Sequence, residues 1–479
     1  MNITVVALGK IGLPLAVQFA SLGHQVIGAD VNAGTVDLVN AGTEPFPGES
    51  FLDEKLADVV SRGLLTATTD TTTAVAQSDA VVVVVPLFVD SDGVPDFGWM
   101  DAATAQIARG LKPGSLVSYE TTLPVGTTRE RFGPMLERGS AEADTGLRVG
   151  DGFHLVFSPE RVFTGRVFAD LRRYPKLVGG VDAASAARGV AFYQAVLEFD
   201  ERPDLARPNG VWDLGSAEAA EMAKLAETTY RDVNIGLANQ FAKFAAGHGI
   251  DVHAVIAASN SQPFSHIHRP GIAVGGHCIP VYPRFYLWND PAATIVAAAR
   301  QTNAEMPAYA VGLLEGAHGD LTGQRVVVLG AAYRPGVKET AFSGVYAAVE
   351  ALRGRGAQGC RGLGRPAGPL QPVHHPHLRF EPGPAQHPGG EPGVGRDERP
   401  GHPVVRRRVP RGGDGQAVHG LSRGRARAAS RRSSGPGRAP PGRPPRCALR
   451  AGPPRSGCGT ADGRSGPPRR PRPNPARRR

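Results

Sequence analysis

The sequence of 479 residues predicts the α/β fold class, with a doubly wound sheet in its amino-terminal part. Three observations support this prediction. Short apolar runs alternate with helical patterns through roughly the first 180 residues, one long helical pattern follows, and strand–helix alternation then starts a second time. After residue 356 the composition changes abruptly, so we expect an ordered body and a disordered tail rich in Arg, Pro and Gly.

A series of apolar runs in the amino-terminal part has the length of buried strands. They span residues 3–8, 25–29, 66–69, 80–85, 115–119, 154–157 and 176–181. Helical patterns lie between several of them, at residues 13–22, from about residue 35 onward, and at 99–109. Pro45 and Pro47 interrupt the segment after the second helix, which we expect to be irregular. Strands separated by helices indicate a parallel, doubly wound sheet.

The pattern of residues 211 to about 246 is that of one long helix, because apolar residues recur there at helical spacing. Its many small residues suit close helix packing. We expect this central helix to form a homodimer contact, and burial against its own chain is equally consistent with the pattern. A fresh strand at 324–330 and a helix at 343–353 then predict the start of a second dinucleotide-type unit.

The charge of the chain is divided unevenly. Residues 357–479 hold 26 Arg, no Lys and six Asp or Glu, a net charge of +20, whereas residues 1–356 have a net charge of −10. The basic tail also holds 23 Gly and 23 Pro, a composition that cannot bury a core. Two interpretations are open, an out-of-frame reading of a GC-rich gene and a genuine arm that binds nucleic acid. We favour the frameshift and expect no nucleic-acid partner, because the tail lacks interleaved aromatic residues.

A glycine motif follows the first predicted strand. Gly9 and Gly12, with Ile11 between them, stand where a strand turns into a helix, and Ala7 occupies the first glycine position of the usual pattern. Glycines there let the backbone approach a pyrophosphate at the helix amino terminus. Asp30 ends the second strand, where a carboxylate accepts from a ribose 2′-hydroxyl and repels a 2′-phosphate. We therefore expect a Rossmann-type domain that binds NAD rather than NADP.

Three further residues are candidates for catalysis. Cys278, in a loop rich in Gly and Pro with His277 beside it, is either a nucleophile or a small buried thiol. Lys224 lies in an Ala-rich helix, where a solvated lysine is the commoner outcome. Glu160 follows a strand and is either a general acid/base or one half of a salt bridge, with Arg161 or with another residue.

Six segments together resemble the UDP-glucose/GDP-mannose dehydrogenase family of nucleotide-sugar 6-dehydrogenases, in the family's order. They are residues 9–16, 121–128, 158–161, 220–227, 275–280 and 329–335, and the resemblance covers residues 1 to about 356. The Gly-Gly-His-Cys-Ile-Pro form of residues 275–280 is similar to the branch that acts on UDP-N-acetyl-hexosamines such as UDP-N-acetylmannosamine.

The resemblance implies an NAD-dependent four-electron oxidation of a sugar C6 alcohol to a uronate, for polysaccharide precursor synthesis. Cys278 would capture the aldehyde as a thiohemiacetal that becomes a thioester, Lys224 would stabilise the oxyanion, and Glu160 and Thr122 would serve proton transfer and water activation. The binding residues implied are Gly9, Ile11, Gly12, Asp30, Pro86 and Thr122 for NAD, and Arg161, Thr228, Gly275, Gly276 and Arg334 for the UDP-sugar.

The domain organisation implied has four parts. They are an NAD-binding domain at 1–205, a central helical and dimerisation domain with the cysteine loop at 206–308, a truncated start of a UDP-sugar-binding domain at 309–356, and the basic tail at 357–479.

Three positions depart from the family pattern. Thr228 stands where Asn is usual, Tyr282 where Asp is usual, and Ala341 where Arg is usual. The alternatives are an inactive remnant that binds only NAD, and a β-hydroxyacid dehydrogenase, which transfers one hydride and does not need Cys278.

The cellular setting is also an expectation. Cys278 is the only cysteine of residues 1–356, the amino terminus has no basic region typical of a signal peptide, and the longest apolar run, at 80–89, contains Pro86 and is too short to cross a bilayer. We expect a cytoplasmic protein with no membrane segment and no metal site.

Overall fold

The computed structural model describes residues 1–90, 92–333 and 340–362, the last four without their side chains. Arg334 and most of the predicted tail therefore lie outside the described residues. The described residues belong to one compact unit of the chain.

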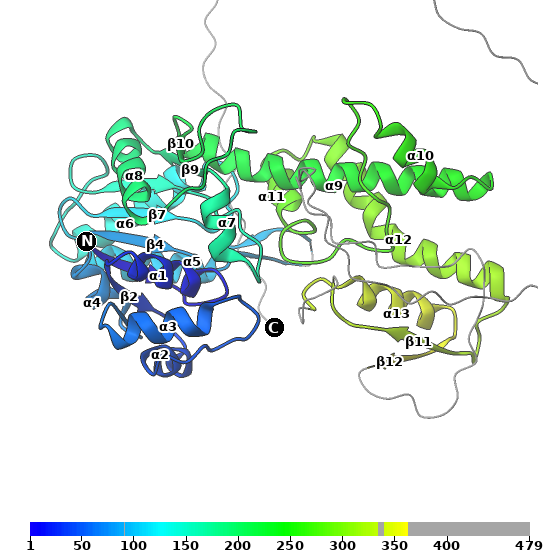
Figure 1. The fold of residues 1–479 in the computed structure, drawn as a ribbon, viewed down its shortest axis with the longest axis horizontal. Coiled ribbons are helices and arrows are strands. Elements are labelled where there is room, and N and C mark those ends of the chain that lie inside the picture. Colours follow the sequence, from blue (N-terminus) through cyan, green and yellow to red (C-terminus); the bar gives the residue numbers. More distant parts are fainter. Residues whose placement is uncertain (91, 334–339, 363–479) are drawn as a thin grey trace, which may run out of the picture. The chain divides into compact units, whose positions relative to one another are not determined.

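An eight-stranded sheet forms the centre of the amino-terminal part (Figure 1). Its order is β10 (Val211–Asp213), β9 (Lys176–Gly180), β8 (His154–Phe157), β7 (Leu116–Tyr119), β4 (Ala80–Val83), β1 (Asn2–Val6), β2 (Gln25–Ala29) and β3 (Leu65–Thr68). The six strands from β8 to β3 are parallel, whereas β9 and β10 run the other way. The chain runs outward from β1 through β2 to β3 and then crosses back to β4 on the other side of β1, and such a reversal is where α/β folds bind ligands.

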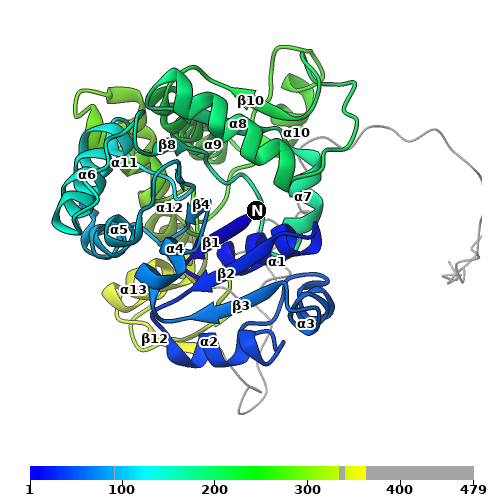
Figure 2. The same ribbon diagram turned by 90° about the vertical axis from the view of Figure 1, so that its left-hand side faces the viewer.

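Helices cover both faces of this sheet (Figure 2). Ile3 and Val5 of β1 lie in one apolar cluster and Val6 lies in the other, because successive strand side chains point to opposite faces. The first cluster includes residues of α1 (Gly12–Ser21), α2 (Ala33–Asn40), α3 (Leu52–Ser61), α7 (Val167–Arg173) and α8 (Ala183–Val196). The second includes residues of α4 (Thr71–Ala76), α5 (Gly98–Gly110), η1 (Thr128–Phe132), α6 (Gly133–Glu142) and the start of α9 (Ala217–Gly247). A short hairpin, β5 (Phe88–Val89) and β6 (Pro95–Asp96), follows β4.

The central part is helical. The long helix α9 leaves the sheet and packs along α12 (Thr294–His318), with α10 (Val252–Ser259) and α11 (Tyr282–Asn289) between them in the chain (Figure 1). The Ser216 hydroxyl accepts the Ala219 N–H at 3.1 Å and caps the start of α9.

A buried polar row fixes α12 on α9. Asp232 pairs with Arg300 at 2.7 Å and accepts a hydrogen bond from the Asn303 amide at 2.8 Å. Asn303 in turn accepts from the Asn239 amide at 2.8 Å. Because unpaired buried polar groups are costly, this row specifies how the two helices align.

A small third part follows α12. Its parallel strands β11 (Arg325–Leu329) and β12 (Gln358–Gly362) flank α13 (Gly344–Gly354), and Val311, Leu321 and Leu352 form its core. Helix α12 runs continuously through the domain boundary expected at residues 308 and 309. Strand β12 also extends the ordered chain into the segment predicted as tail from residue 357.

The structure confirms the α/β class and corrects two predictions. The helix predicted from residue 211 is wrong at its start, because Val211–Asp213 pairs with β9 and Gly215 then takes a positive φ of 83°. The sheet is not wholly parallel, because β9 returns antiparallel to β8. Strand direction cannot be predicted from the pattern of apolar residues, because a parallel and an antiparallel strand show the same pattern.

Candidate active site

The turn from β1 into α1 is shaped to approach a ligand closely. A side chain at Gly12 would place its Cβ 1.9 Å from the Ala7 carbonyl oxygen, so only glycine fits there. Gly9 has open space on the side where a Cβ would lie, and half-buried Ile11 follows it. Ala7 takes a positive φ of 77°, a conformation that favours glycine, at the first glycine position of the motif. This backbone fits a pyrophosphate at the amino terminus of α1.

Asp30 lies beside this turn and is held firmly. Its carboxylate accepts hydrogen bonds from the Leu8 N–H at 2.7 Å and the Asn32 N–H at 2.9 Å. Each oxygen keeps lone pairs that can accept from a ribose hydroxyl. Pro86 is exposed just beyond β4, the strand next to β1. The residues predicted for the dinucleotide therefore follow neighbouring parallel strands at one edge of the sheet.

The structure brings Cys278, Thr122 and Lys224 together around a fourth residue, Tyr282. Cys278 is exposed and precedes α11, and its carbonyl oxygen accepts the Tyr282 N–H at 2.9 Å. Thr122 is buried just beyond β7. Burial, and next the Cys278 side chain, raise the pKa of the Tyr282 phenol, whereas Thr122 lowers it. The Lys224 ammonium lies 5.9 Å from the centre of the Tyr282 ring. Sequence analysis noted Tyr282 only as a departure from the family pattern.

The glycines of the cysteine loop pack against the third part of the chain. Gly276 has a positive φ of 91° and donates its N–H to the Ala341 carbonyl at 3.0 Å. A Cβ at Gly275 would lie 2.6 Å from the Tyr333 Cβ, and one at Gly276 would lie 2.9 Å from the Tyr333 ring. Both glycines therefore permit close packing of the loop, in addition to the substrate contact predicted for them.

Glu160 belongs to a buried charge cluster with Glu120 and Lys176. The Lys176 ammonium lies 2.6 Å from Glu120 Oε2 and 3.0 Å from Glu160 Oε2, and the Tyr193 hydroxyl donates to Glu120 Oε1 at 2.6 Å. Burial raises the pKa of Glu120 to about 7. Burial also opposes ionisation of Glu160, but the charge and hydrogen bond of Lys176, together with the hydrogen bonds from the Arg161 N–H and Glu120, lower the pKa of Glu160 overall. The salt bridge considered for Glu160 thus exists, with Lys176 rather than Arg161.

Two residues predicted for the substrate have other partners in the chain. The Arg161 side chain pairs with Glu227 at 2.9 Å. The Thr228 hydroxyl donates to the backbone carbonyls of Lys224 and Leu225, at 3.0 and 3.1 Å, and Thr228 is buried. The hydroxyl proton of Thr228 is therefore held by its own helix.

Glu221 links the segment that carries Thr122 to the helix that carries Lys224. Its carboxylate accepts from the Gly126 N–H at 2.6 Å, the Thr128 N–H at 2.9 Å and the Thr128 hydroxyl at 2.7 Å. Burial raises the pKa of Glu221 to about 7. No local sequence pattern pointed to Glu221. Glu120 and Lys176 were not predicted either, although a charged residue directly after or within an apolar strand is a usable signal for both.

The raised pKa of Glu221 predicts how stability depends on pH. Between pH 4.5 and about 7 the folded chain holds a proton on Glu221 that the unfolded chain has lost. The free energy of unfolding should therefore fall as pH rises through this window, by about 3 kcal/mol in total, and level off above it. Urea unfolding at pH 4.5 and pH 8 should show this extra loss in the wild type and not in E221Q. Parallel pH dependences would contradict the assignment.

Residues 1–90, 92–333 and 340–362 offer neither a metal site nor a membrane-spanning helix. They contain no group of three or more His, Cys, Asp or Glu that could hold a metal ion. Within the same residues, no helix combines the length and apolar character needed to cross a membrane.

Family models and known proteins match the chain over the same region. The NAD binding domain of the UDP-glucose/GDP-mannose dehydrogenase family matches residues 1–197, and the central domain of that family matches residues 218–305. The UDP-N-acetyl-D-mannosamine dehydrogenase of Pyrococcus horikoshii is 36% identical over 74% of this chain and 81% of its own length.

Solved structures show the same similarity. The UDP-D-ManNAc dehydrogenase structure from Pyrococcus horikoshii aligns with a TM-score of 0.68 at 35% identity, covering 75% of this chain and 82% of that one. The UDP-N-acetyl-mannosamine dehydrogenase from Staphylococcus aureus aligns with a TM-score of 0.65 at 31% identity, with the same coverage of both chains.

Proposed function

Because the chain belongs to the UDP-glucose/GDP-mannose dehydrogenase family and is an NAD-dependent nucleotide-sugar dehydrogenase, we propose that it oxidises the C6 alcohol of a UDP-N-acetyl-hexosamine, such as UDP-N-acetylmannosamine, to the uronate. The predicted family and its UDP-N-acetylmannosamine branch are confirmed. The observation that carries the proposal is an exposed Cys278 at the start of α11, bonded through its carbonyl oxygen to Tyr282, whose ring lies 5.9 Å from the Lys224 ammonium. The product would serve as a precursor of polysaccharides.

NAD is the cofactor, and the residues around the first turn fit it. Gly9, Ile11, Gly12 and Asp30 would hold its pyrophosphate and ribose, and Pro86 and Thr122 are further proposed contacts of NAD. When bound, NAD supplies the hydride acceptor for both oxidations of the sugar.

The Asp30 carboxylate should set the preference for NAD over NADP. A hydrogen bond to a charged group is worth about 1.5–3 kcal/mol, so D30N should weaken NAD binding by about 10- to 100-fold. D37N, which changes an exposed residue of the next helix, should leave it unchanged. Titration of both variants with NAD and NADP measures this. Equal affinity of the wild type for the two dinucleotides would refute the role of Asp30.

Cys278 would act as a nucleophile toward the aldehyde. The first oxidation removes a hydride from C6 and the proton of its hydroxyl, which leaves the aldehyde. The Cys278 sulfur then bonds to C6 while the aldehyde oxygen takes up the thiol proton. The second oxidation removes a hydride from C6 of this thiohemiacetal and the proton of its hydroxyl, and leaves a thioester. Water breaks the C6–sulfur bond, and the products are the uronate and the free thiol. Covalent capture keeps the reactive aldehyde in the site between the two oxidations.

Lys224 and Glu160 would manage charge and protons. The Lys224 ammonium would stabilise negative charge on the C6 oxygen while the tetrahedral species forms and breaks down. Lys176 keeps Glu160 ionised, which is the form that accepts a proton from water or from the sugar hydroxyl. Arg161, Thr228, Gly275, Gly276 and Arg334 stay proposed contacts of the UDP-sugar.

A substrate panel tests the proposal. The chain is incubated with NAD and, separately, with UDP-N-acetylmannosamine, UDP-N-acetylglucosamine, UDP-glucose or GDP-mannose, and NADH formation is followed. We expect kcat/KM for one of the UDP-N-acetyl-hexosamines to exceed that for UDP-glucose by about 100-fold, because a site built for an N-acetyl group leaves polar groups unpaired without it. A preference for UDP-glucose or GDP-mannose would refute the substrate assignment.

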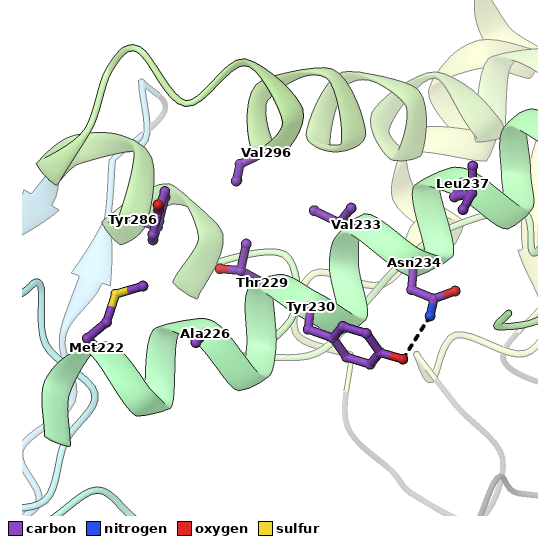
Figure 3. Close-up of a pocket in the computed structure, with 9 residues that line it drawn as sticks. All are labelled: Met222, Ala226, Thr229, Tyr230, Val233, Asn234, Leu237, Tyr286 and Val296. Atoms are coloured by element: carbon purple, nitrogen blue, oxygen red, sulfur yellow. Dashed lines mark hydrogen bonds between the residues drawn. The ribbon is translucent and has the colours of Figure 1, made fainter. Parts of the chain in front are cut away.

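We also propose that α9 joins two copies of the chain. A groove of about 440 Å³ lies along α9 beside α11 and α12, lined by Met222, Ala226, Thr229, Tyr230, Val233, Asn234, Leu237, Tyr286 and Val296 (Figure 3). Tyr230 and Phe244 of α9 are 56% and 62% exposed. A straight apolar row on one helix can pack against the same row of a second copy about a twofold axis.

The mass in solution tests this dimer. Light scattering should give twice the 50.2 kDa chain mass for the wild type and a lower mass for F244E. A monomeric wild type would refute the dimer.

A further inference from the structure

We propose that Arg300 is a positioning residue for Cys278: from α12 it holds the carbonyl oxygen of Pro280, two residues after the cysteine, and so fixes the segment that carries the sulfur. This inference rests on the proposed function, in which Cys278 is the nucleophile. Arg300 lies outside all six segments that resemble the family, and no catalytic or binding role was predicted for it.

The Pro280 carbonyl is the point at which Arg300 reaches this segment. Cys278 is exposed, whereas Pro280 is buried, and a buried carbonyl oxygen needs a hydrogen-bond donor. Arg300 Nη1 donates to it at 3.1 Å. Arg284 Nε also donates to it, at 3.3 Å, but Arg284 belongs to α11, which directly follows the segment. Arg300 therefore ties the cysteine segment to a different helix.

Arg300 is itself held from α9. Its Nε lies 2.7 Å from Asp232 Oδ2, and the two side chains are 14% and 0% exposed. Asn303, one turn further along α12, donates to Asp232 Oδ1 at 2.8 Å. A guanidinium is planar and rigid, so the contact of Nε with Asp232 fixes where Nη1 points. The place of the Pro280 carbonyl thus follows from the packing of α9 on α12.

The backbone passes this constraint to Cys278. The Cys278 carbonyl oxygen accepts the Val281 N–H at 3.3 Å and the Tyr282 N–H at 2.9 Å, so the residues on both sides of Pro280 form one closed turn. Capture of an aldehyde requires the sulfur within reach of C6, and a displacement of about 1 Å can lower the rate by about 10²-fold. Arg300 acts through the backbone rather than on the reacting atoms, which makes it a positioning residue.

Hydrogen–deuterium exchange of the full chain, without NAD or sugar, tests the proposal. We expect R300M to raise the exchange rates of the Val281 and Tyr282 amides by about 10-fold, because their turn loses its tie to α12. The amides of β1 and β4 should exchange at wild-type rates. Q301M is the matched control: Gln301 is the exposed next residue of α12 and bonds Glu305, so the Val281 and Tyr282 amides should exchange as in the wild type.

A second variant guards against a folding defect. R300M leaves Asp232 as an unpaired buried charge, whereas D232N/R300M removes both charges and keeps a similar volume. The double variant should also show faster exchange of the Val281 and Tyr282 amides. Wild-type exchange of these amides in the double variant would overturn the proposal. So would an equal rise along α9 and α12, because that result would assign Arg300 to helix alignment alone.

Kinetics then test the consequence for Cys278. With UDP-N-acetylmannosamine and NAD, D232N/R300M should lower kcat by about 10- to 100-fold, change KM for the sugar by less than about twofold, and release more free aldehyde per NADH than the wild type. A wild-type kcat despite faster exchange would overturn the positioning role. A wild type that oxidises no UDP-sugar would count against the proposed function alone, because the exchange rates need no oxidation.

Discussion

Replacement of Cys278 by alanine should lower steady-state NADH formation from a UDP-sugar by at least about 10³-fold, the largest effect that we expect of any single substitution. Without the sulfur there is no thiohemiacetal, and the free aldehyde lacks the tetrahedral C6 that bears both a hydroxyl and the hydrogen that leaves as the second hydride. The measurement is NADH absorbance in the steady state, together with a carbonyl-specific probe on the quenched reaction to detect an aldehyde.

The same variant provides its own controls. C278A should bind NAD with the affinity of the wild type, because the residues assigned to NAD lie in other segments, and its thermal unfolding should be unchanged because Cys278 is exposed. If C278A still formed two NADH for each sugar, covalent capture by Cys278 would be wrong.

Replacement of Lys224 by methionine should lower kcat by about 10²- to 10³-fold and change KM little. Methionine keeps the apolar stem of the buried side chain and removes only the ammonium, which acts on charge that develops during the reaction. Steady-state kinetics at saturating NAD measure both constants.

Lys243, on the same helix, provides the matched control. It pairs with Glu305 at 3.0 Å on the surface of the helical part, so K243M should retain wild-type kcat. A similar loss of kcat in both variants would assign the effect to helix stability, and an unchanged kcat in K224M would refute the electrostatic role.

Much of the amino-terminal sheet could be predicted from the sequence. Its strands are continuous apolar runs, and β2 and β8 have the predicted bounds. Helices α3, α7 and α8 were missed because their apolar residues are interrupted by charged residues or consist mainly of alanine. The direction of β9 depends on how the chain returns to the sheet after α7, which local periodicity does not record.

The site was predictable where its residues stand in recognisable segments. Cys278 and Lys224 were predicted as catalytic residues from such segments, and Tyr282 lies close to both. The groups that hold the site in place were missed because their partners are far apart in the sequence. Glu221 bonds a loop 93 residues away, and Glu120 and Lys176 are separated by 56 residues. Such pairings follow from the packing of strands and helices rather than from any local pattern.

The number of NADH molecules formed for each sugar consumed tests the central claim most directly. Limiting UDP-N-acetylmannosamine is converted to completion with excess NAD, and the NADH formed is divided by the sugar supplied. A four-electron oxidation through Cys278 predicts a ratio of two, with a uronate as the product. A ratio of one, with an aldehyde or ketone as the product, would contradict the account.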